Sequence, residues 1–191
     1  MKKLIVGGAG FIGSALVKKL SIQRHEIIVI DKLSLGSKKN IKDYPISFYK
    51  ADINNIGAVL KILKKHKNID EIWHLAANSD IPSGVSSIDV DLKDTFMSTV
   101  SILRIMKIIK CKRIYFASSS AIYGINKNKL HEKMGPLFPI SNYGAMKLSS
   151  EALLSASLET YVEKVCIYRF PNVVGVPATH GVILDFMKKL R

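Results

Sequence analysis

The sequence predicts a doubly wound α/β fold of the Rossmann type, in which helices cover both faces of a parallel sheet. Apolar, strand-like runs alternate along the chain with segments of helical periodicity, an order that is typical of parallel sheets. A glycine-rich turn joins the first of these strands to the first helix. Right-handed crossovers between successive strands then place helices on both faces.

Each predicted element follows from composition and spacing. In the first helix, Ile12, Leu16 and Leu20 recur at helical spacing, with Val17 beside them. The predicted strands are Lys3–Val6, Glu26–Ile30, Ser47–Tyr49, Glu71–Leu75, Arg113–Ala117 and Val165–Tyr168. The predicted helices are Phe11–Leu20, Ile56–Lys65, Leu92–Ile109, Tyr143–Glu159 and a last segment, Val182–Leu190. That last helix reaches the end of the sequence, which predicts that the fold continues in a longer parent sequence.

Composition and charge narrow the class of protein. The chain has 48% apolar and 23% charged residues, ordinary values for a folded domain, and no apolar run long enough to span a bilayer. Its formal net charge is +14, but the lysines mostly occur in pairs at the ends of predicted helices, where cations are favoured. We therefore expect no nucleic-acid or membrane partner, with a polyanion site as the less favoured alternative. The two cysteines, Cys111 and Cys166, lack metal spacing and predict buried thiols, no metal site and a cytoplasmic location.

The glycine-rich turn has the spacing expected of a phosphate-binding site. Gly7, Gly10 and Gly13 follow a strand and open an amphipathic helix, in the pattern G-x-x-G-x-x-G. One glycine permits the tight turn, one lets the backbone approach a pyrophosphate, and one lets the helix pack on the sheet. Free N–H groups at the helix N-terminus then face the phosphates.

An acidic residue ends the second strand. Asp31 lies where a carboxylate would accept hydrogen bonds from the adenosine ribose, and its charge would repel a 2′-phosphate, so NAD is favoured over NADP. Lys32 weakens this preference because a cation could attract that phosphate. Asp52 and Ile53, after the third strand, are candidate adenine contacts, with a helix N-terminal acid as an equal alternative for Asp52.

A catalytic group is predicted at the same carboxyl edge of the sheet. Tyr143 and Lys147 are four residues apart in a predicted helix and so share one face. A lysine beside a phenol favours the phenolate and lowers its pKa, so Tyr143 could exchange a proton with a sugar hydroxyl. Ser118, Ser119 and Ser120 close the fifth strand at the edge where doubly wound sheets bind ligands.

Five segments occur together in a fixed order: Gly7 to Gly13, His74 to Ala77, Ser118 to Gly124, Tyr143 to Lys147, and Arg169 to Gly175. This combination resembles the NAD-dependent epimerase/dehydratases of the extended short-chain dehydrogenase/reductase superfamily. Within them the chain is most similar to UDP-sugar 4-epimerases of the UDP-glucose type, and Asp31–Ser34 and Pro139–Gly144 add to this likeness. The resemblance covers essentially all 191 residues.

The resemblance implies a reaction by transient oxidation of a nucleotide sugar, with bound NAD as cofactor. Tyr143 would take the proton of the sugar C4 hydroxyl, Lys147 would hold the nicotinamide ribose, and Ser119 would be the catalytic hydroxyl. The residues implied to contact NAD are Gly7, Gly10, Phe11, Ile12, Gly13, Asp31, Asp52, Ile53, Leu75, Ala76, Ala77, Tyr143 and Lys147. Those implied to contact the nucleotide sugar, expected to be UDP-linked, are Ser119, Ser120 and Asn172.

Departures from the family pattern refine this expectation. Dehydratases carry an acid pair where this chain has Ser120 and Ala121, and decarboxylating relatives need an acid at the second position, so epimerisation is favoured over both. Family members also continue well past residue 191. We therefore expect an NAD-binding domain over 1–175, the start of an incomplete substrate-binding region over 176–191, and little turnover by the chain alone. A non-catalytic NAD-binding module is the alternative.

The resemblance also implies an assembly. Relatives dimerise through two helices, which here would be Leu92–Ile109 and Tyr143–Glu159, so a homodimer is expected.

Overall fold

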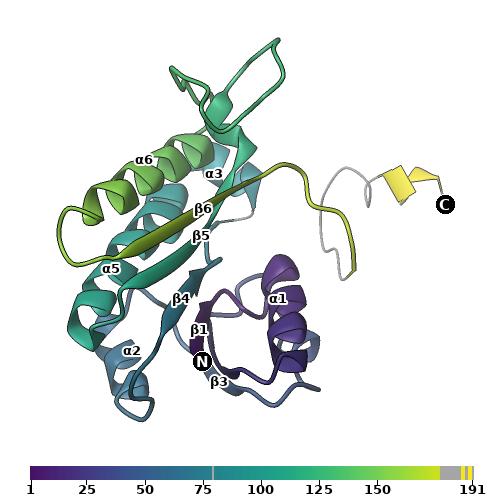
Figure 1. Cartoon of the computed structure of the whole chain (residues 1–191). Helices are drawn as coiled ribbons and strands as arrows, with labels where there is room; N and C mark the ends of the chain where they lie inside the picture. Colours follow the sequence, from purple (N-terminus) through teal and green to yellow (C-terminus); the bar gives the residue numbers. More distant parts are fainter. Residues whose placement is uncertain (79, 177–185, 188, 191) are drawn as a thin grey trace.

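Within the part of the chain that the structure describes, six strands form one parallel sheet. The computed structural model describes residues 1–78, 80–176, 186–187 and 189–190 (Figure 1). The strand order is β3-β2-β1-β4-β5-β6, and every pairing is parallel. The chain therefore crosses to one side after β1 and to the other side after β3, which leaves a switch point between β1 and β4. The strands are β1 (Lys2–Val6), β2 (Glu26–Asp31), β3 (Ser47–Lys50), β4 (Glu71–His74), β5 (Arg113–Ser119) and β6 (Lys164–Phe170).

Helices pack on both faces of this sheet, as predicted. The elements are α1 (Phe11–Ile22), α2 (Ile56–Leu63), α3 (Ile81–Ser86), α4 (Ile88–Asp91), α5 (Ser98–Ile109) and α6 (Asn142–Ser157), with η1 (Lys38–Asn40), η2 (Leu92–Met97) and η3 (Ser120–Tyr123). One hydrophobic core lies between the sheet and α2, α5 and α6, and a second lies under α1 on the opposite face (Figure 1). Within the described ranges, no helix is long and apolar enough to cross a membrane.

The predicted helix Leu92–Ile109 is divided. Its first part, η2, is π-helical, and only Ser98–Ile109 is α-helical. The Ser98 and Thr99 hydroxyls both donate hydrogen bonds to the Thr95 carbonyl, and such back-bonding competes with the regular helical ladder. The short helices α3 and α4 were not predicted. Most of the predicted helix Val182–Leu190, and most of 176–191, lies outside the described residues, so the expected domain boundary at 175 stays a prediction.

Candidate active site

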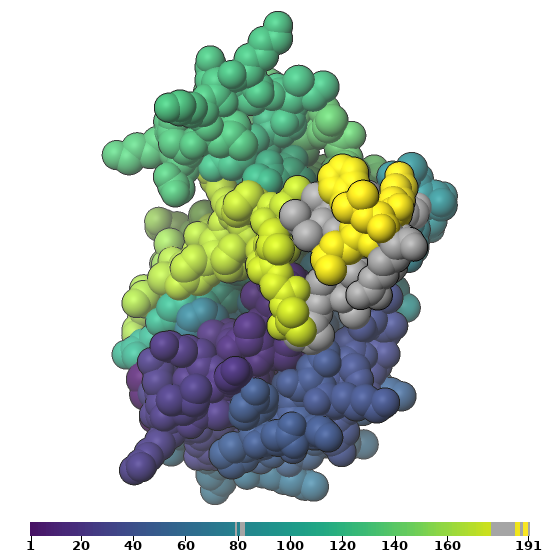
Figure 2. Space-filling model, turned by 90° about the vertical axis from the view of Figure 1, so that its right-hand side faces the viewer, coloured from purple at the N-terminus to yellow at the C-terminus, as the bar shows by residue number. Residues whose placement is uncertain are grey.

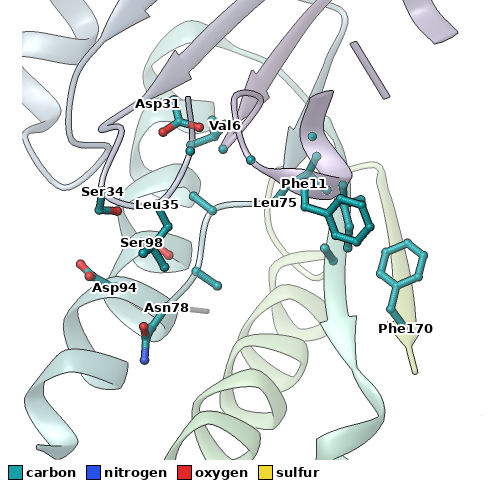
Figure 3. A pocket seen from close by; sticks show the side chains of 18 of the residues that line it. Val6, Phe11, Asp31, Ser34, Leu35, Leu75, Asn78, Asp94, Ser98 and Phe170 are labelled. Atoms are coloured by element: carbon teal, nitrogen blue, oxygen red, sulfur yellow. The ribbon is translucent and has the colours of Figure 1, made fainter. Parts of the chain in front are cut away.

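A cavity of about 920 Å³ opens at the carboxyl edge of the sheet. It is lined by the ends of β1, β2, β5 and β6, the residues that follow β4, the start of α1, and residues of η2, α5 and α6. Figure 3 shows Asp31, Ser34, Leu35 and Asp94 on one side of this pocket, with Phe11 and Phe170 on the other. Sequence-predicted residues that line it are Gly7, Gly10, Phe11, Ile12, Gly13, Asp31, Asp52, Ile53, Leu75, Ala76, Ala77, Ser119, Tyr143, Lys147 and Asn172.

Ser120 is the predicted site residue that does not line this cavity. It begins η3 directly after Ser119, whose hydroxyl accepts a hydrogen bond from the Ala121 N–H at 3.1 Å. The chain therefore turns away from the sheet edge between the two serines. Contact between Ser120 and a substrate stays a prediction.

The glycine turn has the shape that a dinucleotide phosphate requires. Gly7 has φ +83°, and a Cβ there would lie 2.6 Å from the Ala76 nitrogen, so only glycine fits. A Cβ at Gly13 would lie 2.2 Å from the Gly7 carbonyl oxygen, so this glycine lets α1 approach the turn. At Gly10, by contrast, a Cβ would lie 3.4 Å from the Gly7 carbonyl oxygen, its nearest neighbour among the described residues, which is an ordinary contact distance. Gly10 therefore keeps space open for a ligand.

The N-terminus of α1 points at this space. Gly10 is the N-cap and offers no side chain to the free N–H groups of the first turn. Unsatisfied N–H groups and the positive end of the helix dipole favour an anion at this position. Together with the room at Gly10, this arrangement fits the pyrophosphate of NAD.

Asp31 is buried, 9% exposed, and held in place by the backbone. Its Oδ2 accepts a hydrogen bond from the Ala9 N–H at 2.9 Å, and its Oδ1 accepts one from the Leu33 N–H at 2.8 Å. A carboxylate has about four acceptor positions, so two remain for ribose hydroxyls. The carboxylate is thus fixed before any ligand binds.

Asp52 also faces the cavity, and it is not the residue that caps the next helix. Its Oδ1 accepts the Asn54 N–H at 2.9 Å, whereas the cap of α2 is Asn55, which accepts the Ala58 N–H at 3.1 Å. This leaves Asp52 and Ile53 on the cavity wall next to Asp31.

The predicted catalytic side chains meet at the far end of the cavity. Tyr143 and Lys147 lie on one face of α6, and the Ser119 hydroxyl at the end of β5 is hydrogen-bonded to Tyr143. Lys147 is 2% exposed, and its Nζ lies 5.6 Å from the centre of the Tyr143 ring and donates a hydrogen bond to the Ala117 carbonyl at 2.5 Å. The predicted helix spacing places Tyr143 and Lys147 on one face, and the end of β5 brings Ser119 to the same cavity.

The predicted lowering of the Tyr143 pKa is wrong for the free chain. Burial raises the pKa of Tyr143 to about 12; the hydrogen bond from Ser119 opposes this rise and the charge of Asp91 adds to it. Burial also lowers the pKa of Lys147 to about 7, with the Glu151 carboxylate opposing. Because the Lys147 ammonium is directed to the Ala117 carbonyl, desolvation outweighs any effect of the lysine on the phenol.

Two acidic residues at the site were missed in the sequence. One is Asp94, which forms an ion pair with Lys32 at 2.6 Å, and both residues of this pair line the cavity. Behind the catalytic group, buried Glu151 accepts hydrogen bonds from Ser118 and, at 2.8 Å, from Arg169. Glu151 is four residues after Lys147, so helical spacing could have identified it. The Asp94 contact joins residues far apart in sequence and left no local signal.

The fold and the cavity define an α/β domain of the dinucleotide-binding type with a Ser, Tyr and Lys group at one end. The chain belongs to the NAD dependent epimerase/dehydratase family, whose model matches residues 3–191. It is 34% identical over 182 residues to a UDP-glucose 4-epimerase of Lactobacillus helveticus, covering 95% of this chain and 54% of that relative. The chain thus spans about half the length of this relative.

Solved structures agree with this membership. The UDP-glucose 4-epimerase of Thermotoga maritima, solved with UDP-glucose, has a TM-score of 0.90 and 30% identity, over 99% of this chain and 62% of that structure. A double mutant of dTDP-glucose 4,6-dehydratase from Streptomyces venezuelae, solved with NAD bound, has a TM-score of 0.89 and 29% identity. This match covers 100% of the present chain and 62% of the dehydratase structure. The fold is therefore shared by members with two different reactions.

Proposed function

We propose that these residues form the NAD-binding and catalytic part of a nucleotide-sugar 4-epimerase that acts on a UDP-sugar through a transient keto intermediate. The observation that carries the proposal is that one cavity joins the glycine turn at one end to Ser119, Tyr143 and Lys147 at the other. Bound NAD would supply the hydride acceptor and donor. Gly10 and Asp31 would hold its phosphates and adenosine ribose, and Lys147 its second ribose.

Tyr143 would move the proton of the sugar hydroxyl, with Ser119 sharing the hydrogen bond. In the free chain the phenol is protonated at neutral pH, because its pKa is about 12. A nearby cation favours the phenolate, so Lys147 would assist ionisation when its amine is protonated. With the pKa of Lys147 at about 7, that assistance would depend on pH near neutrality.

Epimerisation is preferred over dehydration because of the residues that follow Ser119. Ser120 and Ala121 begin η3, and neither side chain can transfer a proton at neutral pH. Elimination of water requires such an acid and base next to the sugar. The alternative is an NAD-binding module without catalysis.

The test of catalysis is a fusion in which these residues replace the matching part of the Lactobacillus helveticus relative. We expect the fusion to interconvert UDP-glucose and UDP-galactose, and Tyr143→Phe to lower kcat by about 10² to 10⁴-fold while NAD still binds. Tyr168→Phe, at an exposed tyrosine outside the cavity lining, is the matched control and should leave kcat unchanged. A fusion that binds NAD without interconverting these sugars would contradict the epimerase proposal and favour the module.

We also propose that the protein is a homodimer. An apolar hollow of about 380 Å³ lies between α5 and α6, where Leu103, Leu153 and Tyr161 meet. These are the two helices through which relatives were expected to pair. Sedimentation of the chain at micromolar concentration should show a dimer, and a strictly monomeric profile would contradict this proposal.

A cytoplasmic location is proposed from the cysteines. Cys111 is buried, Cys166 is half-buried, and both are free thiols. Free thiols of this kind persist in a reducing compartment. Detection of the protein in a secreted or periplasmic fraction would contradict the location.

A further inference from the structure

An ion pair faces the nucleotide end of the cavity. Lys32 follows β2 directly, and its ammonium lies 2.6 Å from the Oδ2 of Asp94, which η2 contributes from the other side of the switch point. Both side chains are half-buried, 36% and 22% exposed, and both line the cavity. Figure 3 shows Asp94 on the same side of the pocket as Asp31, Ser34 and Leu35.

The charges at this end decide which dinucleotide fits. NADP differs from NAD by a phosphate on the adenosine ribose, next to the carboxylate at the end of the second strand. Asp31 repels that phosphate, whereas a free lysine directly after it would attract the phosphate. The Lys32 ammonium is instead directed to Asp94. Two carboxylates and one ammonium leave this end of the cavity with one net negative charge.

We propose that Asp94 is a specificity-determining residue for the dinucleotide. By holding the Lys32 ammonium in an ion pair, Asp94 withholds it from a 2′-phosphate, and the site keeps its preference for NAD although a lysine follows Asp31. This inference rests on the proposed NAD site. It assigns to η2, which is far from β2 in the sequence, a part in cofactor selection.

A purely structural role is the competing explanation for the ion pair. Lys112 and Glu163 form a pair of the same 2.6 Å length on the surface, 53% and 59% exposed, and both lie outside the cavity lining. Exposed pairs of this kind contribute little to stability. If the ion pair between Lys32 and Asp94 only stabilised the surface, removing Asp94 would change the affinities for NAD and NADP equally.

The experiment measures Kd for NAD by calorimetry, and for NADP by competition, on the full chain at one fixed low salt concentration. Low salt is needed because salt screens half-exposed charges. We expect Asp94→Asn to lower the ratio of the NADP Kd to the NAD Kd about five-fold, the scale of one half-exposed charge pair. Lys32→Gln should abolish this effect, so that Lys32→Gln and the double variant give the same ratio. Glu163→Gln changes the net charge equally and should leave the ratio unchanged.

The outcomes separate this inference from the function on which it rests. If the wild-type chain binds NAD but Asp94→Asn leaves the ratio unchanged, or changes it equally in the Lys32→Gln background, the role of Asp94 is overturned and the NAD site stands. If Glu163→Gln shifts the ratio as much as Asp94→Asn does, net charge rather than the ion pair is responsible. A folded wild-type chain that binds neither dinucleotide would overturn the NAD site and the role of Asp94 with it.

Discussion

The two ends of the cavity are built differently. The nucleotide end is formed by the glycine turn and the ends of β1 and β2, where Val6 is 2% exposed and Asp31 is fixed by two backbone N–H groups. The sugar end is bordered by Phe170 and Asn172, and the segment that continues from them toward Phe11 of α1 is exposed, with Val174 at 64% and Val176 at 92%. In Figure 2 this yellow-green segment runs over the face toward the purple N-terminal part.

This difference separates cofactor binding from substrate recognition. Packing and backbone hydrogen bonds order the nucleotide end without a ligand, which is the condition for tight binding. At the sugar end Asn172 and the residues after it are exposed, so little in the described chain fixes them. We therefore expect the chain to bind NAD more strongly than it binds a UDP-sugar.

The largest expected effect is at Gly13. Its Cβ would lie 2.2 Å from a backbone oxygen that cannot move aside, so Gly13→Ala should lower the free energy of unfolding by about 3 kcal/mol, at the upper end of overpacking costs. Urea denaturation measures this change. An alanine variant as stable as the wild type would mean that α1 does not depend on this close approach.

Gly10 offers the contrasting test, because it faces open space. Gly10→Ala should leave the urea midpoint nearly unchanged but weaken NAD binding about 30-fold, which corresponds to about 2 kcal/mol. Calorimetry with the folded variant measures the loss. Undiminished affinity would show that the phosphates do not lie against Gly10.

Two valines that both line the cavity compare a buried part of its lining with an exposed part. Val6→Ala should cost about 1.5 kcal/mol of stability, from two lost methyl groups and a small void. Val176→Ala, at a side chain that is 92% exposed, should change stability by less than about 0.5 kcal/mol. Equal costs, measured by urea denaturation, would contradict the contrast between an ordered and an exposed end.

The smallest expected effect is a pH dependence from Lys147. Its pKa is about 7 when folded and 10.5 ordinarily, so between these values the unfolded state holds a proton that the folded state has released. Stability must then rise with pH across this window, by about 1 kcal/mol from pH 7 to pH 8. Lys147→Met, which cannot titrate, should lack this rise. Parallel profiles for the two proteins would contradict the buried, deprotonated amine.

Local patterns predicted the fold and much of the site, and long-range contacts account for what they missed. The glycine turn was predictable because the spacing of Gly7, Gly10 and Gly13 is local in the sequence. The shared face of Tyr143 and Lys147 was predictable because helical periodicity is also local. The Tyr143 pKa depends on burial, which periodicity does not measure. The division of the predicted helix Leu92–Ile109 depends on the Ser98 and Thr99 hydroxyls, which donate hydrogen bonds to the Thr95 carbonyl. The pair between Lys32 and Asp94 depends on the crossover that brings η2 beside β2.

Native mass spectrometry of the purified chain tests the central claim most directly, because it reports bound cofactor and assembly in one spectrum. The ordered nucleotide end predicts one NAD per chain, retained or taken up from solution, and the proposed α5 and α6 contact predicts a dimer. A folded chain that carries no NAD and takes up none when it is added would contradict the claim that these residues form a complete nucleotide site.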